Sequence, residues 1–169
     1  MDSGILVLRL VLGLLMAAHG AQKLFGWFGG HGLAGTSGFF ESLGFRPGRF
    51  FATAAAISEV GGGLLTVVGL FGPVGPALML SVMIVGAVSV HAANGLFAMS
   101  NGIEVPLLYG VGAAALALTG PGQYSLDALF GLTSLWTSTL SWAALAAGIL
   151  GGIANLSLRR RPAPAPAAA

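Results

Sequence analysis

Six polar residues stand in or beside long apolar stretches of this chain, and together their side chains could hold a small polar headgroup and relay protons. They are His19, Lys23, Glu59, His91, Asn94 and Glu104. Imidazole, ammonium and amide groups donate hydrogen bonds, and carboxylates accept them. Ionisable groups inside a membrane are costly and by default mark a functional site. We therefore predict that these six residues bind a ligand.

Each of the six also has an ordinary structural role open to it. Glu59 lies deep in an apolar stretch, so it needs either a proton or a cation, and Lys23 or Arg9 could supply the cation in a purely structural ion pair. Glu104, which precedes Pro106 closely, could complement a helix N-terminus. The remaining roles are packing for His19, snorkelling for Lys23 and turn formation for Asn94.

The composition of the chain points to a membrane environment. Of its 169 residues, 56% are hydrophobic and only 7% are charged, whereas a soluble domain averages roughly 25% charged residues. A net charge of +2 with no extended basic stripe argues against nucleic acid as a partner. The absence of cysteine excludes disulfides, thiolate metal sites, iron–sulfur clusters and thiol nucleophiles.

Five apolar stretches have about the length that a helix needs to cross a bilayer. They are residues 4–25, 50–71, 76–93, 103–119 and 134–158. Prolines and glycines at 72–76 and 120–122 end one helix and allow the next to begin. The predicted fold is therefore all-α, a polytopic membrane helix bundle.

We predict three parts within this bundle. Residues 1–131 form a four-helix membrane domain, and its first loop, residues 27–49, has the scattered apolar side chains of an amphipathic or re-entrant segment that could cover the site. Residues 132–158 form an additional transmembrane helix, and residues 159–169 a basic, Pro/Ala-rich tail. The additional helix carries a ridge of small residues that suits close helix contact, either in a homo-oligomer or with the rest of this chain: Ala144, Gly148 and Gly152.

The order of the spans predicts where the candidate residues meet. In an up-and-down bundle the polar residues at the end of the first and third spans and at the start of the fourth share one membrane face, and Glu59 lies roughly 14 Å into the second span. Lysine and arginine are enriched on cytoplasmic flanks, and here they flank the first loop and follow the last span. We therefore expect a multi-pass protein of the plasma or inner membrane with a cytoplasmic C-terminus.

A set of short motifs resembles the DoxX family over about residues 5–131. These are His19-Gly20-(x)2-Lys23-Leu24-Phe25-Gly26, Phe39-Phe40-(x)2-Leu43-Gly44, Glu59-(x)2-Gly62-Gly63, His91-(x)2-Asn94-Gly95-(x)-Phe97, Asn101-Gly102-(x)-Glu104-(x)-Pro106 and Gly120-Pro121-Gly122-(x)-Tyr124-Ser125-(x)-Asp127. The resemblance implies a small four-helix membrane protein, to which residues 132–158 add a fifth, C-terminal transmembrane helix. It also implies a link to thiosulfate:quinone oxidoreduction and to membrane partners of redox complexes.

Two functions from different classes follow from these observations. In the first, the chain is redox-associated and binds a quinone or another lipid-soluble ligand at the polar cluster, with Trp27, Phe28 and Phe97 as candidates to flank the ring. If the chain is an enzyme at all, it is then a quinone-linked oxidoreductase subunit that needs a partner subunit or a bound cofactor to carry electrons.

In the second, the chain is a non-catalytic membrane anchor or assembly partner of redox enzymes. Two further alternatives stay open. One is a small-solute or proton transporter, which a buried carboxylate and glycine-rich helices would allow. The other is a haem or metal site held by His19 and His91; the two leading interpretations involve no metal.

Overall fold

The computed structural model describes residues 1–160, and helices are the only regular elements in that part of the chain. From residue 161 onward, the predicted Pro/Ala-rich tail lies outside the described residues. The α-helices are α1 (Asp2–Phe25), α2 (Gly32–Ser42), α3 (Gly48–Val68), α4 (Val74–Gly86), α5 (Glu104–Thr119), α6 (Leu126–Leu129) and α7 (Ser138–Ser157). Short 3-10 turns lie at Trp27–Gly29, Ala92–Asn94, Ala98–Ser100 and Thr133–Leu135, and a π-helical turn at Ala87–His91 continues α4.

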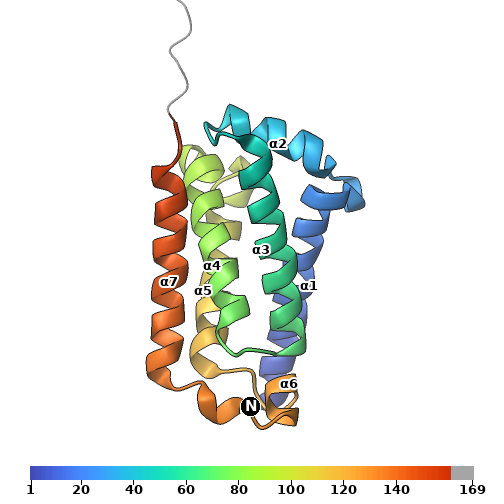
Figure 1. Ribbon diagram of the computed structural model, residues 1–169, viewed down its shortest axis with the longest axis vertical. Coiled ribbons are helices and arrows are strands. Elements are labelled where there is room, and N and C mark those ends of the chain that lie inside the picture. Colours follow the sequence, from blue (N-terminus) through green and yellow to red (C-terminus); the bar gives the residue numbers. More distant parts are fainter. Residues whose placement is uncertain (161–169) are drawn as a thin grey trace, which may run out of the picture.

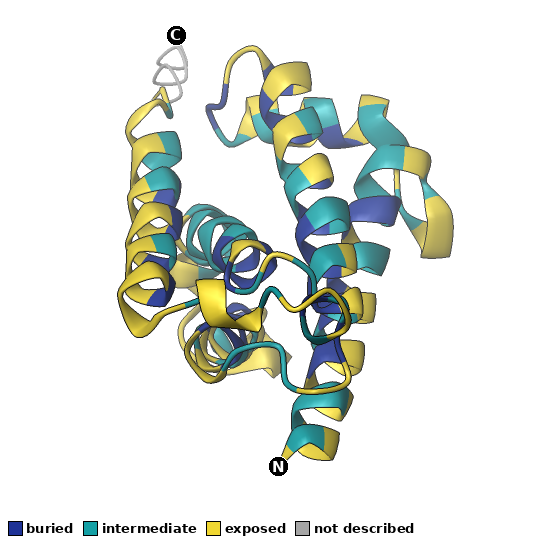
Figure 2. Cartoon of the chain, turned by 60° about the horizontal axis from the view of Figure 1, so that its bottom comes forward, coloured by how far each residue is buried: buried dark blue, intermediate teal, exposed yellow. Residues whose placement is uncertain are grey.

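The helices have the lengths of a membrane bundle. Four of them, α1, α3, α7 and α4 with its continuation to Asn94, are long and apolar enough to cross a membrane, and α5 is a shorter apolar helix of 16 residues. Exposed residues cover the outer faces of these helices, and buried residues lie where the helices meet (Figure 2). Outward apolar side chains such as Leu150 and Ile153 contact lipid in this arrangement. The predicted all-α polytopic bundle is confirmed.

Glycine allows the helices to approach closely. A methyl group on Gly13 of α1 would lie 2.7 Å from the carbonyl oxygen of Gly63 in α3, and one on Gly63 would lie 2.6 Å from that of Gly13. The two backbones therefore touch, which is how helices without a hydrophobic driving force gain contact energy in lipid.

The small-residue ridge of α7 is used inside the chain. A methyl group on Gly148 would lie 2.5 Å from the Ala77 carbonyl oxygen of α4, and one on Gly152 would lie 3.0 Å from that of Ser81. Both glycines are buried by this contact. Of the two predicted uses of the ridge, docking on the rest of the chain is therefore the one that the structure shows for Gly148 and Gly152; a homo-oligomer through Ala144, Gly148 and Gly152 stays a prediction.

The predicted amphipathic first loop contains a helix that crosses one end of the bundle. Helix α2 lies over the end where α3 begins and α1 ends, while the N-terminus and α6 lie at the opposite end (Figure 1). The C-terminal end of α7 reaches the α2 end, where Arg159 Nε donates to the Leu43 carbonyl and the Arg160 N–H donates to that of Gly44 (2.8 Å). Helix α2 therefore covers this end of the bundle as a lid, and the turn that follows it is hydrogen-bonded to the segment after α7.

Candidate functional site

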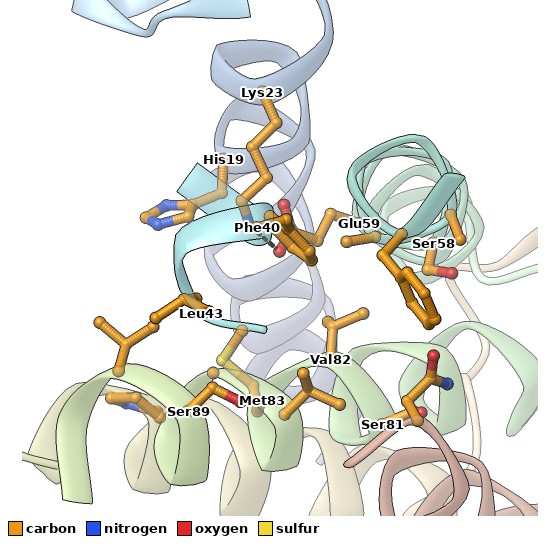
Figure 3. Close-up of a pocket in the computed structure, with 18 of the residues that line it drawn as sticks. His19, Lys23, Phe40, Leu43, Ser58, Glu59, Ser81, Val82, Met83 and Ser89 are labelled. Carbon is orange, nitrogen blue, oxygen red and sulfur yellow. Dashed lines mark hydrogen bonds and ion pairs between the residues drawn. The ribbon is translucent and has the colours of Figure 1, made fainter. Parts of the chain in front are cut away.

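A cavity of about 420 Å³ lies beneath α2, among α1, α3, α4 and α5 (Figure 3). This volume falls in the range of small-molecule and cofactor sites. Its walls are mostly apolar and include Met16, Phe39, Phe40, Phe45, Val82 and Met83. The polar side chains that line it come chiefly from α1, α3 and the continuation of α4, with Ser81 of α4, Tyr109 of α5 and Asn155 of α7 beside them. The cavity therefore has the mostly apolar walls and few polar groups of a ligand pocket.

Glu59 is the buried acidic group of this cavity. Its side chain is 2% exposed, and its Oε1 forms an ion pair with the Lys23 ammonium of α1, which is 25% exposed. Its second oxygen, Oε2, is buried and has no hydrogen-bond partner among residues 1–160. The sequence predicted Lys23 or Arg9 as the cation that pairs with Glu59. The structure shows Lys23, and a pair with Arg9 is wrong because Arg9 donates to backbone carbonyl oxygens instead. An ionised carboxylate with one empty oxygen is unfavourable in an apolar interior.

His19 adds an imidazole to the same space. It stands one helical turn before Lys23 on α1, as the i, i+4 spacing predicts, and it lines the cavity (Figure 3). Lys23 and His19 thus present a cation and a titratable ring from one face of one helix.

The π-helical turn at Ala87–His91 brings two further polar groups to the cavity. Ser89 and His91 both line it, and the buried Ser89 hydroxyl oxygen has no hydrogen-bond partner in the described part of the chain. The His91 ring places Nδ1 2.8 Å from the Asn101 carbonyl oxygen. Single π-helical turns inside α-helices occur frequently at functional sites because they re-aim side chains. Sequence reasoning missed Ser89; the available signal was a serine in an apolar span, two residues before His91.

The structure does not bring Asn94 and Glu104 into the cavity. The Asn94 amide donates to the carbonyl oxygens of Val90 (3.2 Å) and Asn101 (3.3 Å), and Glu104 Oε2 accepts the Ala98 N–H (2.7 Å). Both side chains stabilise the connection between α4 and α5 through hydrogen bonds to its backbone. Four of the six predicted residues, His19, Lys23, Glu59 and His91, therefore meet at one cavity, and two belong to the loop beside it.

The aromatic side chains of the cavity differ from those expected. Trp27, Phe28 and Phe97 are exposed and do not line it. The rings that do so belong to α2, to the turn after it and to α3 and α5, and they are Phe39, Phe40, Phe45, Phe51 and Tyr109. The sequence predicted that the first loop could cover the site, but it did not show which of the loop's rings face inward, so the rings nearest to the polar motif were predicted in place of Phe39, Phe40 and Phe45.

A second polar cluster, formed by Arg9 and Asp127 with the backbone groups that they bond, lies at the opposite end of the bundle. Arg9 is 3% exposed. Its guanidinium donates to the carbonyl oxygens of Thr66 (3.0 Å), Val67 (2.7 Å), Pro121 (2.6 Å) and Tyr124 (2.8 Å). These bonds add donors to the last turn of α3, where the Thr66 carbonyl also accepts the Gly69 N–H (3.2 Å), and they fasten the loop after α5 to that turn.

Asp127 completes this Arg9–Asp127 cluster. Its side chain is fully buried and accepts the N–H groups of Phe71 (3.0 Å) and Gly72 (2.6 Å) through its two oxygens. Ser125 begins the short helix α6 by accepting the Ala128 N–H (3.1 Å). The cluster thus joins the α3–α4 turn to the segment after α5, and its polar atoms are used by the chain itself.

Histidine and carboxylate side chains are few at either end. Within the described residues no group of three or more His, Cys, Asp or Glu side chains is placed to hold a metal ion.

Comparison with known proteins identifies relatives of this chain. The family model described as DoxX matches residues 4–92, a range that contains His19, Lys23, Glu59, Ser89 and His91 of the cavity. Inner membrane protein YqjF of Escherichia coli (strain K12) is 31% identical over 133 residues, which cover 76% of this chain and 92% of that protein. No solved structure matches the chain.

Proposed function

This chain belongs to the DoxX family, and we propose that its cavity binds the headgroup of a quinone or a similar lipid-soluble ligand in a redox-associated process. The observation that carries the proposal is the empty Glu59 Oε2, a buried carboxylate oxygen that faces no protein donor beside a cavity of about 420 Å³. Buried polar atoms are rarely left unpaired. A bound ligand would supply the missing donor.

The surroundings of Glu59 suit an amphiphilic ligand. Phe39 and Phe40 of the lid and Val82 and Met83 of α4 offer apolar contact to a ring or a chain. Polar groups that could fix the orientation of a headgroup gather on the α1, α3 and α4 walls. A ligand of this kind would reach the cavity from the bilayer, which the crossing helices contact directly.

The chain would take part in electron transfer only through a partner subunit or a bound cofactor. Its sequence has no cysteine to ligate an iron–sulfur cluster, and the hard step of a redox reaction is carried by a cofactor. In this proposal a redox enzyme subunit docks on the membrane protein and exchanges electrons with the bound ligand. The cavity residues bind and orient the headgroup and handle its protons.

We also propose that the α2 end of the bundle faces the cytoplasm. Five basic residues lie where α1 ends, where α3 begins and just after α7, and so at that end: Lys23, Arg46, Arg49, Arg159 and Arg160. Cytoplasmic flanks are enriched in such residues. The chain has no native cysteine, so Arg160→Cys provides a unique thiol. A membrane-impermeant maleimide should label it only after the membrane is permeabilised, whereas labelling of intact cells would reverse the orientation.

A second candidate function is a non-catalytic anchor for a redox enzyme, and one surface favours it. The connection 94–104 is held by the side chains of Asn94, Ser100 and Glu104, and it presents Phe97 and Met99, the latter 96% exposed. A rigid loop with apolar side chains outside is suited to docking. Phe97→Ser with Met99→Ser should abolish partner recruitment under this candidate and leave ligand content unchanged.

The test of the leading proposal is mass spectrometry of the organic extract of gently purified protein. Wild type should yield a quinone or similar ligand near one per chain, and Glu59→Gln and His91→Ala should lose it while remaining folded. The matched controls are Glu104→Gln and His31→Ala, which change the same residue types outside the cavity. Bulk phospholipid alone in all five samples would contradict ligand binding and favour the anchor.

A further inference from the structure

The polar groups of the cavity differ in what they can offer to a ligand. The Glu59 carboxylate is ionised, because its Oε1 pairs with the Lys23 ammonium. A carboxylate oxygen accepts hydrogen bonds and donates none. Glu59 Oε2 is buried and has no partner within residues 1–160. It is therefore an unfilled acceptor that an O–H or N–H group of a ligand can satisfy.

His91 presents a second acceptor. Its Nδ1 lies 2.8 Å from the carbonyl oxygen of Asn101, and because a carbonyl can only accept, Nδ1 carries the proton. In the neutral ring the other nitrogen, Nε2, then has a free lone pair. The loop bond thus selects the tautomer in which His91, a residue of the cavity wall, accepts at Nε2.

Ser89 does not change this balance. Its hydroxyl lacks a partner in the part of the chain that the structure describes, and a hydroxyl can either donate or accept. The Lys23 ammonium uses one N–H group on Glu59 Oε1, and its other N–H groups, like the N–H of a neutral His19 ring, can donate to a quinol hydroxyl and to a dione carbonyl alike. Two positions, Glu59 Oε2 on α3 and His91 Nε2 on the continuation of α4, can therefore only accept, and they are the groups that discriminate between the two forms of the ligand.

We infer that the cavity prefers the hydroxyl-bearing, reduced quinol form of its ligand over the oxidised dione, because Glu59 Oε2 and His91 Nε2 both require donors. This inference rests on the proposed function, and it specifies the redox form that is bound. Quinol hydroxyls donate to both groups, whereas the carbonyl oxygens of the dione would face a carboxylate oxygen with no proton between them. A cationic headgroup also donates, but the neighbouring Lys23 ammonium repels it.

The size of the preference follows from the charge on Glu59. A hydrogen bond to a charged group contributes roughly 1.5–3 kcal/mol, and each 1.4 kcal/mol is about a tenfold difference in affinity. We therefore expect the quinol to bind at least about tenfold more tightly than the dione. Glu59→Gln should weaken the binding of the quinol, so that the ligand is lost during purification, and should lower the ratio of the two affinities toward one in a titration, since the glutamine amide can donate to a carbonyl as well as accept from a hydroxyl.

The experiment is anaerobic calorimetric titration of the full chain, stripped of lipid ligands in detergent, with decyl-substituted benzoquinone, its reduced quinol and decylamine. We expect the quinol to bind most tightly and decylamine most weakly, and Glu104→Gln to keep the wild-type order because Glu104 lies outside the cavity. Equal or tighter binding of the dione to wild type would overturn this inference and leave the proposed function standing.

Two other outcomes are decisive in their own ways. If neither the quinone nor the quinol binds, the proposed function fails and this inference with it. If Glu59→Gln binds neither form, the ratio of quinol to dione affinity in wild type and in Ser89→Ala still tests the preference for the quinol. Ser89→Ala should keep the preference for the quinol, because both fixed acceptors remain in place.

Discussion

The two polar clusters of this bundle lie at opposite ends and are satisfied to opposite degrees. In the Arg9–Asp127 cluster each guanidinium nitrogen donates to a carbonyl oxygen, and both carboxylate oxygens accept backbone N–H groups. In the cavity, Glu59 Oε2 and the Ser89 hydroxyl are buried without a partner among residues 1–160. At one end the polar atoms of the cluster are hydrogen-bonded within the chain, and at the other some of them have no hydrogen-bond partner in the described residues.

The two clusters also differ in the volume of empty space beside them. The cavity measures about 420 Å³, whereas the pocket beside Arg9 measures about 10 Å³, close to the minimum for a single water. Polar groups that the chain satisfies in a closed space stabilise the fold. Polar groups left unsatisfied beside an open space are candidates for binding. The comparison therefore separates structural from functional charge within one small membrane protein.

The largest effect that this comparison predicts is on stability at the closed end. Arg9→Met keeps an apolar stem but leaves the carbonyl oxygens of Val67, Pro121 and Tyr124 without their donor, while that of Thr66 keeps the Gly69 N–H, and we expect the free energy of unfolding to fall by about 3–5 kcal/mol. Thermal unfolding in detergent should show a Tm lower by about 10 °C. The control Arg49→Met changes an exposed arginine; an equal loss in both variants would remove the structural role of Arg9.

Asp127→Asn should have the next largest effect. One of its two accepting oxygens becomes an amide that faces a backbone N–H of Phe71 or Gly72, so the free energy of unfolding should fall by about 2 kcal/mol. Chemical denaturation measures this loss. Asp2→Asn is the matched control, because its amide oxygen can still accept the Gln123 N–H; if it destabilised the protein as much, burial of Asp127 would not be the cause.

Glu59→Gln should behave in the opposite way, with a large effect on ligand content and a small effect on stability. We expect the free energy of unfolding of ligand-free protein to change by less than about 1 kcal/mol, since loss of the ion pair is offset by removal of a buried charge and Lys23 is partly exposed. Unfolding of delipidated protein tests this. A fall in the free energy of unfolding as large as that of Arg9→Met would show that both clusters have a structural role and would contradict the distinction between them.

The smallest effect should come from Glu104→Gln. The amide oxygen can still accept the Ala98 N–H, so the α4–α5 connection keeps its shape, and we expect less than about 0.5 kcal/mol of destabilisation. Ligand content, measured on the same extracts, should be unchanged. Loss of the ligand in this variant would extend the site from the cavity into the loop.

Much of this arrangement was predictable from the sequence. Apolar length and the glycine and proline breaks predicted the crossing helices, and the order of the helices predicted that the motif residues of α1 and α4 would meet at one end. The i, i+4 spacing of His19 and Lys23 predicted their common face. These features follow from periodicity and connectivity alone, which is why they hold in the structure.

The direction of loop side chains was not predictable in the same way. Asn94 and Glu104 share residue types with the cavity group, and only the folded connection shows that they bond Val90, Asn101 and Ala98. The partners of Arg9 are backbone carbonyls, which any residue carries, so no sequence pattern marks them. Asp127 stands in a four-residue helix that is too short for a periodic signal.

The most direct test of the account is an experimental map of the protein purified with its native lipids. We predict ordered non-protein density within hydrogen-bond distance of Glu59 Oε2, between the α2 lid and the α4 wall, and no such density beside Arg9. A cavity in which Glu59 Oε2 bonds only to water, or in which α2 collapses onto α4 and leaves no space, would contradict it.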